Sequence, residues 1–179
     1  MAKAKRDSLV FYKALSIIAI AVALVAVLQP YLKSIEFSPA LLPISELSTQ
    51  GYTKMDVQVS TSENTGVVIL NSQCWQLTAS TELTQVESIA NGLEGKFNFR
   101  PNSHDLMKDA LDGLDVEVVM VKVIDIQNNT FIGRLVLKQG DKIVSLDSRP
   151  SDGIAIAVRT NAPVYMKNEL LEQQGKYTC

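Results

Sequence analysis

Two carboxylates and a guanidinium fall within one short polar segment, which runs from Asp147 to Asp152. Carboxylate oxygens are ligands that Mg²⁺ and Mn²⁺ readily accept, so Asp147 and Asp152 are candidate catalytic residues and metal ligands. Arg149, between them, carries the planar fork of donors that binds a phosphate group bidentately, and Ser151 adds a hydroxyl beside it. A structural interpretation also fits, in which Arg149 forms an ion pair with Asp147 or Asp152.

A second polar segment lies earlier in the chain and contains Arg100, His104 and Asp105. His104 is a candidate for proton transfer, and Asp105 is a candidate catalytic group and third metal ligand. Arg100 precedes a proline and a helix start, a position suited to anion binding. Alternatively, Asp105 favours the positive end of the helix dipole and His104 hydrogen-bonds within the core. Because the chain has one histidine, a histidine-rich metal centre is excluded within one subunit.

The two segments can form one site only if the fold brings them together, because they are far apart in the sequence. The prediction is therefore geometric: His104, Asp105, Arg149 and Asp152 should converge in one cleft. If these side chains point to separate surfaces, the catalytic hypothesis fails.

Hydrophobic periodicity predicts the elements that position these residues. Apolar runs and alternations predict strands at 55–59, 67–70, 75–79, 116–126, 131–137, 142–146 and 163–166. Apolar stripes predict helices at 82–93, capped by Thr81, and at 168–174. Two more are predicted, one starting at Asn102 or Ser103 and one capped by Ser151. Hairpins mixed with single helices indicate an α+β class, with a mixed, largely antiparallel sheet and three to four helices. The long strand 116–126 is expected to leave an open edge, which suggests a homo-oligomer.

The first 51 residues have the composition of a membrane anchor and a tether. Residues 14–28 hold no charge, and residues 9–28 would form about 30 Å of helix, enough to cross a bilayer core. The basic residues before this span predict a cytoplasmic tail at 1–8 and a domain facing outward. A cleaved signal peptide is the alternative, although no small-x-small pair closes the apolar run. Prolines predict a tether at 29–51, so the folded domain should span 52–179.

Charge and cysteine content limit the possible partners. Residues 1–37 carry five basic and two acidic groups, and since the whole chain carries −2, residues 38–179 carry −5. An acidic domain argues against broad, sequence-independent binding of nucleic acid. The two cysteines are Cys74 and Cys179. We expect free thiols rather than a bridge, because Cys179 is the last residue and chain ends fray.

Three groups of motifs resemble the bifunctional nuclease domain family. They are 93–95 with 100–106, then 125–131, and then 147–159 with 162–165. The resemblance runs from about residue 67 to about residue 171 and implies an α+β domain. For plant members it also implies nuclease activity on RNA and DNA. The residues that match the family pattern by position are Arg100, His104, Asp105, Asp147, Arg149, Ser151 and Asp152.

The chain departs from the family pattern at Gln85 and Val86, where a glutamate-alanine pair is usual, and at Gly153, where alanine is usual. Two hypotheses follow. In the first, Mg²⁺ or Mn²⁺ held by Asp105, Asp147 and Asp152 assists hydrolysis of RNA or DNA, and His104 moves protons. Arg100, Arg149 and Ser151 then bind the substrate. In the second, the domain binds an anion or a partner without catalysis; Gln85 and the acidic charge favour this alternative.

Overall fold

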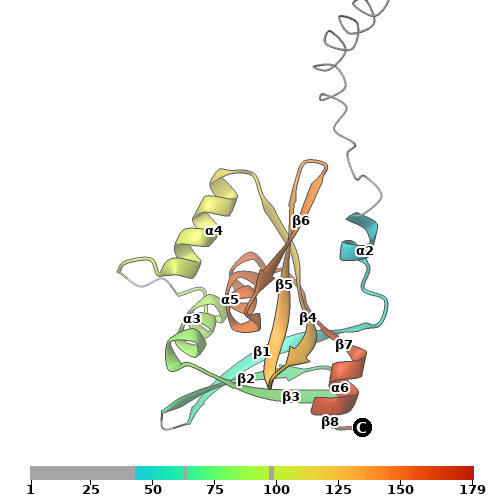
Figure 1. The fold of residues 1–179 in the computed structure, drawn as a ribbon. Helices are drawn as coiled ribbons and strands as arrows, with labels where there is room; N and C mark the ends of the chain where they lie inside the picture. The colour runs from blue at the N-terminus through green and yellow to red at the C-terminus, as the bar shows by residue number, and fades with distance from the viewer. Residues whose placement is uncertain (1–42, 63, 97–98) are drawn as a thin grey trace, which may run out of the picture. The chain divides into compact units, whose positions relative to one another are not determined.

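A computed structural model describes residues 43–62, 64–96 and 99–179 as an α+β domain on one eight-stranded sheet (Figure 1). The predicted tail at 1–8, the anchor at 9–28 and most of the tether at 29–51 lie outside these residues. The strands are β1 (Tyr52–Ser62), β2 (Thr65–Asn71), β3 (Trp75–Thr81), β4 (Glu117–Gln127), β5 (Thr130–Gln139), β6 (Lys142–Ser148), β7 (Val164–Lys167) and β8 (Lys176–Tyr177). Their spatial order is β6-β5-β4-β7-β1-β2-β3-β8. Only β4 and β7 pair in parallel within this sheet, so the predicted mixed, largely antiparallel sheet is confirmed.

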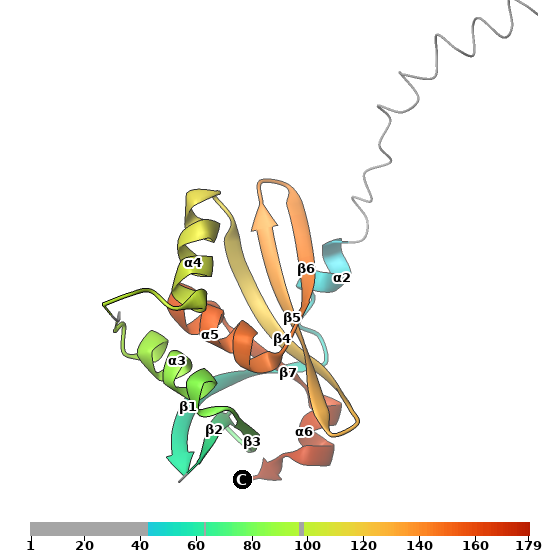
Figure 2. The same ribbon diagram turned by 60° about the vertical axis from the view of Figure 1, so that its left-hand side comes forward.

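Three helices of similar length cover one face of the sheet: the third lies between the second and the strands, and the first packs on β1 and β2 (Figures 1 and 2). They are α3 (Leu83–Leu93), α4 (Ser103–Gly113) and α5 (Pro150–Thr160). A short helix, α2 (Pro43–Leu47), lies within the segment predicted as a tether, and α6 (Asn168–Gln174) follows β7. No helix of the described residues combines the length and apolar character needed to cross a bilayer.

Helix α5 lies between the sheet and the other helices, and its middle residues are small or aliphatic on every side. Ile154, Ala155, Ile156 and Ala157 are all buried. At Gly153, an added Cβ would lie 3.1 Å from a methyl carbon of Val121 on β4, which is tighter than normal packing. The absence of a side chain there therefore brings the first turn of α5 close to the central strands.

Two helix starts differ from the sequence prediction. Helix α3 begins at Leu83, and its N-cap is Glu82 rather than Thr81. Helix α5 begins at Pro150 with Arg149 as N-cap, so Ser151 lies inside the first turn and does not cap the helix. Proline favours the first helical position because its ring fixes φ and it has no N–H to satisfy. This shift places Arg149 at the amino end of the helix.

The long strand β4 is not an edge strand, so the expectation that residues 116–126 leave an open edge for self-pairing is wrong. It pairs with β5 on one side and with β7 on the other. The parallel β4–β7 pair forms because α5 returns the chain from β6 to the middle of the sheet. One exposed edge is β6, where Val144 and Leu146 are 46% and 39% exposed.

The prediction of two free thiols is wrong, because Cys74 and Cys179 form a disulfide. Strand β8 pairs with β3, and the N–H of Thr178 donates to the carbonyl of Cys74 at 2.8 Å. The rings of Trp75 and Tyr177 also pack edge to face, with centroids 5.2 Å apart. These contacts hold the last residues against the sheet, so the two sulfurs meet.

The face of the sheet opposite α5 carries a buried lysine. Lys122 on β4 is 4% exposed and donates to the carbonyls of Glu46 at 2.5 Å and Ser48 at 2.7 Å. Its ammonium also lies 5.0 Å from the ring centroid of Tyr52. Burial lowers the pKa of Lys122, and the negative charge of Glu46 offsets part of that effect. Lys122 thus fastens α2 and the residues after it to the central strand.

Candidate functional site

The amino end of α5 holds a charged pair that is open to solvent. Nε of Arg149 donates to Oδ2 of Asp152 at 2.9 Å, and the two side chains are 61% and 34% exposed. The pairing follows from the helix start, since an N-cap residue and the third helical residue lie on the same side of the first turn. Of the two partners predicted for Arg149, the structure selects Asp152.

His104 joins this pair from the first turn of α4. Its Nε2 lies 3.3 Å from Oδ1 of Asp152, and its Nδ1 lies 2.9 Å from Oγ of Ser88 on α3. Asn102 positions the histidine by capping α4: its side chain accepts hydrogen bonds from the backbone N–H groups of His104 and Asp105. His104 is 9% exposed, so this side chain belongs to the interior of the domain.

The hydrogen bonds around Ser88 assign the tautomer of His104. Oγ of Ser88 accepts from Nδ2 of Asn102 at 3.1 Å and from Nη2 of Arg159 at 3.2 Å. A hydroxyl has two lone pairs and one proton, so the Ser88 proton is left to donate to Nδ1 of His104. His104 then carries its proton on Nε2 and donates it to Asp152. In this arrangement the neutral imidazole orients a carboxylate.

Asp105 lies deeper, in a buried ion pair with Arg159. Nε of Arg159 donates to Oδ1 of Asp105 at 2.7 Å, and the two side chains are 3% and 4% exposed. Nη1 of Arg159 also donates to the carbonyls of Ser88 at 3.0 Å and Ala155 at 2.7 Å. Oδ2 of Asp105 accepts from the N–H of Asn102 at 2.9 Å, which completes a capping box. The Asp105–Arg159 pair therefore links α3, α4 and α5.

The pKa values of both carboxylates reflect these partners. Burial alone would raise the pKa of Asp105, but hydrogen bonds from Arg159 and Asn102 and the charge of Arg159 outweigh it and lower the pKa. Burial also acts to raise the pKa of Asp152, and Arg149, followed by His104, outweighs it and lowers the pKa. Both groups are therefore carboxylates at neutral pH.

Asp147 and Arg100 do not join the cluster. Asp147 is directly opposite Arg134 in the β5–β6 ladder, and their side chains approach to 3.9 Å. Alternation along a strand places Asp147 on the same face as Lys122, away from α5. Arg100 is exposed in the connection between α3 and α4 and makes no hydrogen bond or ion pair within the described part of the chain.

The three predicted metal ligands do not fit a shared divalent cation. Asp105 is buried and already bound by Arg159 and Asn102, and Asp147 lies on the opposite face of the sheet. Asp152 alone remains at the partly exposed position. Among the residues that the structure describes, no group of three histidine, cysteine or acidic side chains is arranged to hold a metal ion.

Gln85 lies on α3 one turn before Ser88. Residues three apart on a helix share a face, so Gln85 is on the side of α3 that faces α5. Its Oε1 is buried and has no hydrogen-bond partner in the described structure. A buried acceptor without a donor therefore lies beside the network.

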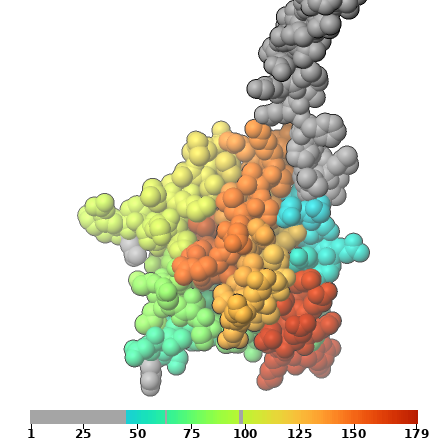
Figure 3. Space-filling view, viewed as in Figure 1, coloured from blue at the N-terminus to red at the C-terminus, as the bar shows by residue number. Residues whose placement is uncertain are grey.

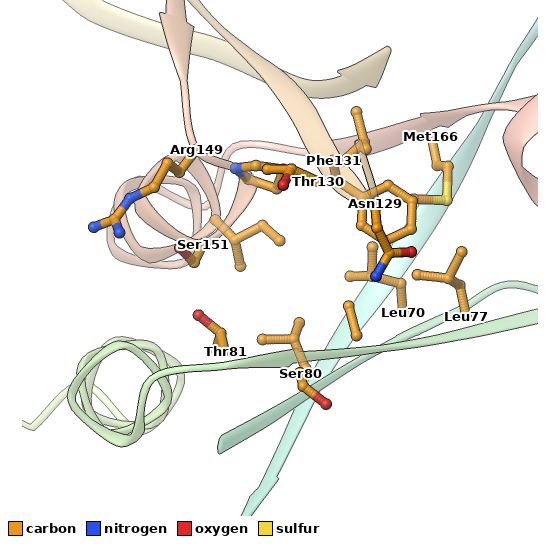
Figure 4. Close-up of a pocket in the computed structure, with 15 residues that line it drawn as sticks. Leu70, Leu77, Ser80, Thr81, Asn129, Thr130, Phe131, Arg149, Ser151 and Met166 are labelled. Atoms are coloured by element: carbon orange, nitrogen blue, oxygen red, sulfur yellow. The ribbon is translucent and has the colours of Figure 1, made fainter. Parts of the chain in front are cut away.

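A cavity of about 260 Å³ opens next to Arg149, between the start of α5, the end of β3 and the turn that joins β4 to β5 (Figure 4). Ser151 lies at its rim, which is where the structure places this predicted substrate-binding residue. The end of β6 and the start of α5 also form part of the surface in the space-filling view (Figure 3). The lining residues are Val68, Leu70, Leu77, Ala79, Ser80, Thr81, Val123, Asn129, Thr130, Phe131, Arg149, Pro150, Ser151, Ile154 and Met166.

His104, Arg149 and Asp152 are directly linked by hydrogen bonds, and Asp105 lies behind them. Of these four residues, however, only Arg149 lines the cavity, so the four do not share one cleft as predicted. Sequence reasoning missed Ser88 and Arg159, which complete the network. One signal was available for each: Ser88 is a polar residue on the apolar face of α3, and Arg159 follows an uninterrupted apolar run in α5.

The protein is thus a small α+β domain in which an arginine, an aspartate and a histidine are hydrogen-bonded in series. They lie at the amino end of the helix that follows an edge strand. The chain belongs to the bifunctional nuclease domain family, whose model matches residues 68–178. This range extends the predicted match of 67–171 to include β8.

Curated proteins from two kinds of organism are similar to this chain. Uncharacterized proteins from two strains of Mycobacterium tuberculosis are each 31% identical over 121 residues, which cover 66% of this chain and 72% of the relative. Bifunctional nuclease 2 and bifunctional nuclease 1 of Arabidopsis thaliana are 38% and 32% identical over 79 residues. That segment is 42% of this chain and 24% of each plant protein, so the likeness covers about a quarter of their length.

Proposed function

We propose that this protein hydrolyses the phosphodiester backbone of single-stranded RNA or DNA at the amino end of α5. The observation that carries the proposal is the arrangement of Asp152, which is held through one oxygen by Arg149 and through the other by His104. A carboxylate fixed in this way, beside an exposed guanidinium, is a candidate general base.

Arg149 binds the phosphate in this proposal. Its described hydrogen bond uses Nε, so both Nη groups remain to donate to phosphate oxygens. The amino end of α5 adds the positive end of the helix dipole. Arg100 lies on the exposed connection before α4 and is a further cation that could contact the neighbouring phosphates of the nucleic acid.

Asp152 accepts the proton of the attacking water as the new phosphorus–oxygen bond forms. The bond to the leaving oxygen breaks, and that oxygen takes a proton from solvent. Because the pKa of Asp152 is lowered, the carboxylate is a weak base, and we expect slow turnover. His104 and Asp105 act behind it: His104 orients Asp152, and Asp105 supports the start of α4. No step passes through a divalent cation, since the predicted ligands are dispersed.

Binding without hydrolysis is the second candidate function. Two features favour it: both ring nitrogens of His104 are engaged in the interior, and Gln85 stands where the family resemblance implies a glutamate. In this case Arg149 and the start of α5 would bind a phosphodiester or another anion, and the acidic domain would not turn it over.

One experiment separates the two functions. The full chain is incubated with end-labelled single-stranded RNA and DNA, with Mg²⁺, with Mn²⁺ and with chelator, and products are resolved on a gel. Cleavage that Asp152→Asn abolishes supports hydrolysis, whereas retained binding without cleavage supports the second candidate. Asp147→Asn is the matched control and should leave cleavage unchanged, because Asp147 lies on the other face. Cleavage equal in Asp152→Asn and the unmodified chain would refute the proposed site.

We also propose that the domain works outside the cytoplasm, anchored by the apolar segment at 9–28. The disulfide between Cys74 and Cys179 supports this location, because such bonds persist in oxidising compartments. Protease protection of the domain in closed membrane vesicles tests the orientation. A homo-oligomer remains a proposal as well, and the exposed apolar edge of β6 is the surface we suggest for it.

A further inference from the structure

The cavity beside Arg149 has an apolar interior with one aromatic ring. Leu70, Leu77, Val123, Ile154 and Met166 contribute aliphatic or thioether groups, and Phe131 is the aromatic residue among its lining side chains. Its volume is about 260 Å³. An apolar protein cavity of about 150 Å³ holds a benzene ring, so this cavity has room for a one- or two-ring heterocycle.

The mouth of the cavity differs from its interior in carrying polar side chains. They are Thr81 at the end of β3, Asn129 and Thr130 at the β4–β5 turn, and Ser151 on α5, whereas the hydroxyl of Ser80 points away from the cavity (Figure 4). None of these four side chains hydrogen-bonds another described residue, so their donors and acceptors are available. A saturated lipid chain would leave such groups without partners, whereas the edge of a nucleobase presents both donors and acceptors.

Arg149 lies at the same rim, but its guanidinium points away from the apolar interior (Figure 4). A ligand that used both features would place a flat apolar ring inside the cavity and an anionic group outside it. A nucleotide unit has this arrangement, because its base and its phosphate are joined through a sugar.

We propose that this cavity receives one unpaired nucleobase of the bound strand, packed against Phe131, while the adjoining phosphate lies on Arg149. The inference rests on the proposed function and adds a base-binding subsite to it. Single-stranded substrates follow from it, since a base paired within a duplex cannot enter. Contact between bases and aromatic side chains tolerates different sequences, so the subsite should select single strands more than particular bases.

The test compares two strands that share a backbone. Binding of the full chain to a fluorescein-labelled single-stranded oligodeoxynucleotide is measured by anisotropy, next to the same strand made entirely of abasic sites. We expect the strand with bases to bind about ten-fold more tightly, which is the scale of base stacking on one aromatic side chain. Ala79→Leu, which fills the cavity, should reduce binding of the normal strand to the abasic level. Ala110→Leu, on the exposed face of α4, is the matched control and should change neither.

The outcomes separate the subsite from the proposed function. Arg149→Ala should weaken the binding of both oligonucleotides, because both contain phosphates. Equal affinity for the two strands, with both weakened by Arg149→Ala, would overturn the subsite and leave the proposed function standing. Failure of both strands to bind would overturn the proposed function first. Should Ala79→Leu not fold, Asn129→Gly removes a polar group at the mouth and suits the left-handed backbone there (φ 61°). Asn129→Gly should weaken the binding of only the oligonucleotide that carries bases.

Discussion

Replacing Arg159 with methionine should lower the unfolding free energy by about 3–5 kcal/mol, because it leaves the carboxylate of Asp105 buried without its cation. The side chains are 3% and 4% exposed, so water cannot take the place of the guanidinium. Arg159 also donates to two carbonyls and to Ser88, and these acceptors would lose a partner too. The loss is large beside a typical total of about 5–15 kcal/mol.

Urea unfolding at neutral pH, followed by circular dichroism, measures this loss. Arg134→Met is the matched control, since Arg134 faces Asp147 at 3.9 Å with both side chains well exposed, and it should change stability by about 0.5 kcal/mol or less. The double variant Arg159→Met/Asp105→Asn removes the buried charge and keeps an acceptor for the N–H of Asn102. Its loss should therefore be smaller than the sum of the two single losses. Additivity within about 0.5 kcal/mol would refute the reasoning, because it would mean that the two groups do not interact.

The pH dependence gives a second check on the same pair. The pKa of Asp105 is lower in the folded chain than in the unfolded chain, so the unfolded state takes up protons first as the pH falls. The contribution of Asp105 is therefore complete above the unfolded value of about 3.9 and is lost as the pH drops through the lower folded value. Asp105→Asn should lack this contribution, so its stability should fall less steeply below about pH 4. Equal slopes in both proteins would contradict the proposed pairing.

Three further predictions follow from the structure. His104→Gln can still offer an N–H to Asp152, so it should retain more cleavage than His104→Ala, with an unchanged pH profile; an acidic limb lost in both variants would instead indicate proton transfer by His104. Cys74→Ser should lower the unfolding free energy by about 2–4 kcal/mol, since the disulfide closes a long loop, and thermal unfolding with and without reductant checks this. Leu146→Lys, on the exposed edge of β6, should leave the domain folded and shift any oligomer toward monomer in light scattering; an unchanged mass would remove β6 as the interface.

The sequence predicted most elements because their periodicity is local. The helix predicted at 168–174 matches α6 in its bounds. The strands predicted at 116–126, 131–137 and 142–146 match β4, β5 and β6. The helix starts were predicted less accurately. Thr81 and Ser151 have good capping side chains, but the helices are capped at Glu82 and Arg149 instead. The choice at α5 depends on Pro150, which prefers the first helical position to the one before it.

The site could be predicted only in part, because strand register decides which face a side chain occupies. Asp147 and Asp152 are close in sequence, yet pairing with Arg134 turns Asp147 to the far face. The roles of Ser88 and Arg159 depend on a contact between residues 71 positions apart, which no local pattern contains. The prediction of free thiols failed for a similar reason, because the two sulfurs are aligned by the pairing of β3 with β8, which is a contact between distant parts of the chain.

The position of Lys122 has a practical consequence for how the domain can be handled. Its two carbonyl acceptors lie at Glu46 and Ser48, on the side of the sheet opposite His104 and Asp152. A dye or a surface linker attached near Gln50 would therefore leave the amino end of α5 open to solution. Immobilised in this way, the domain would present its charged pair to an oligonucleotide flowing past.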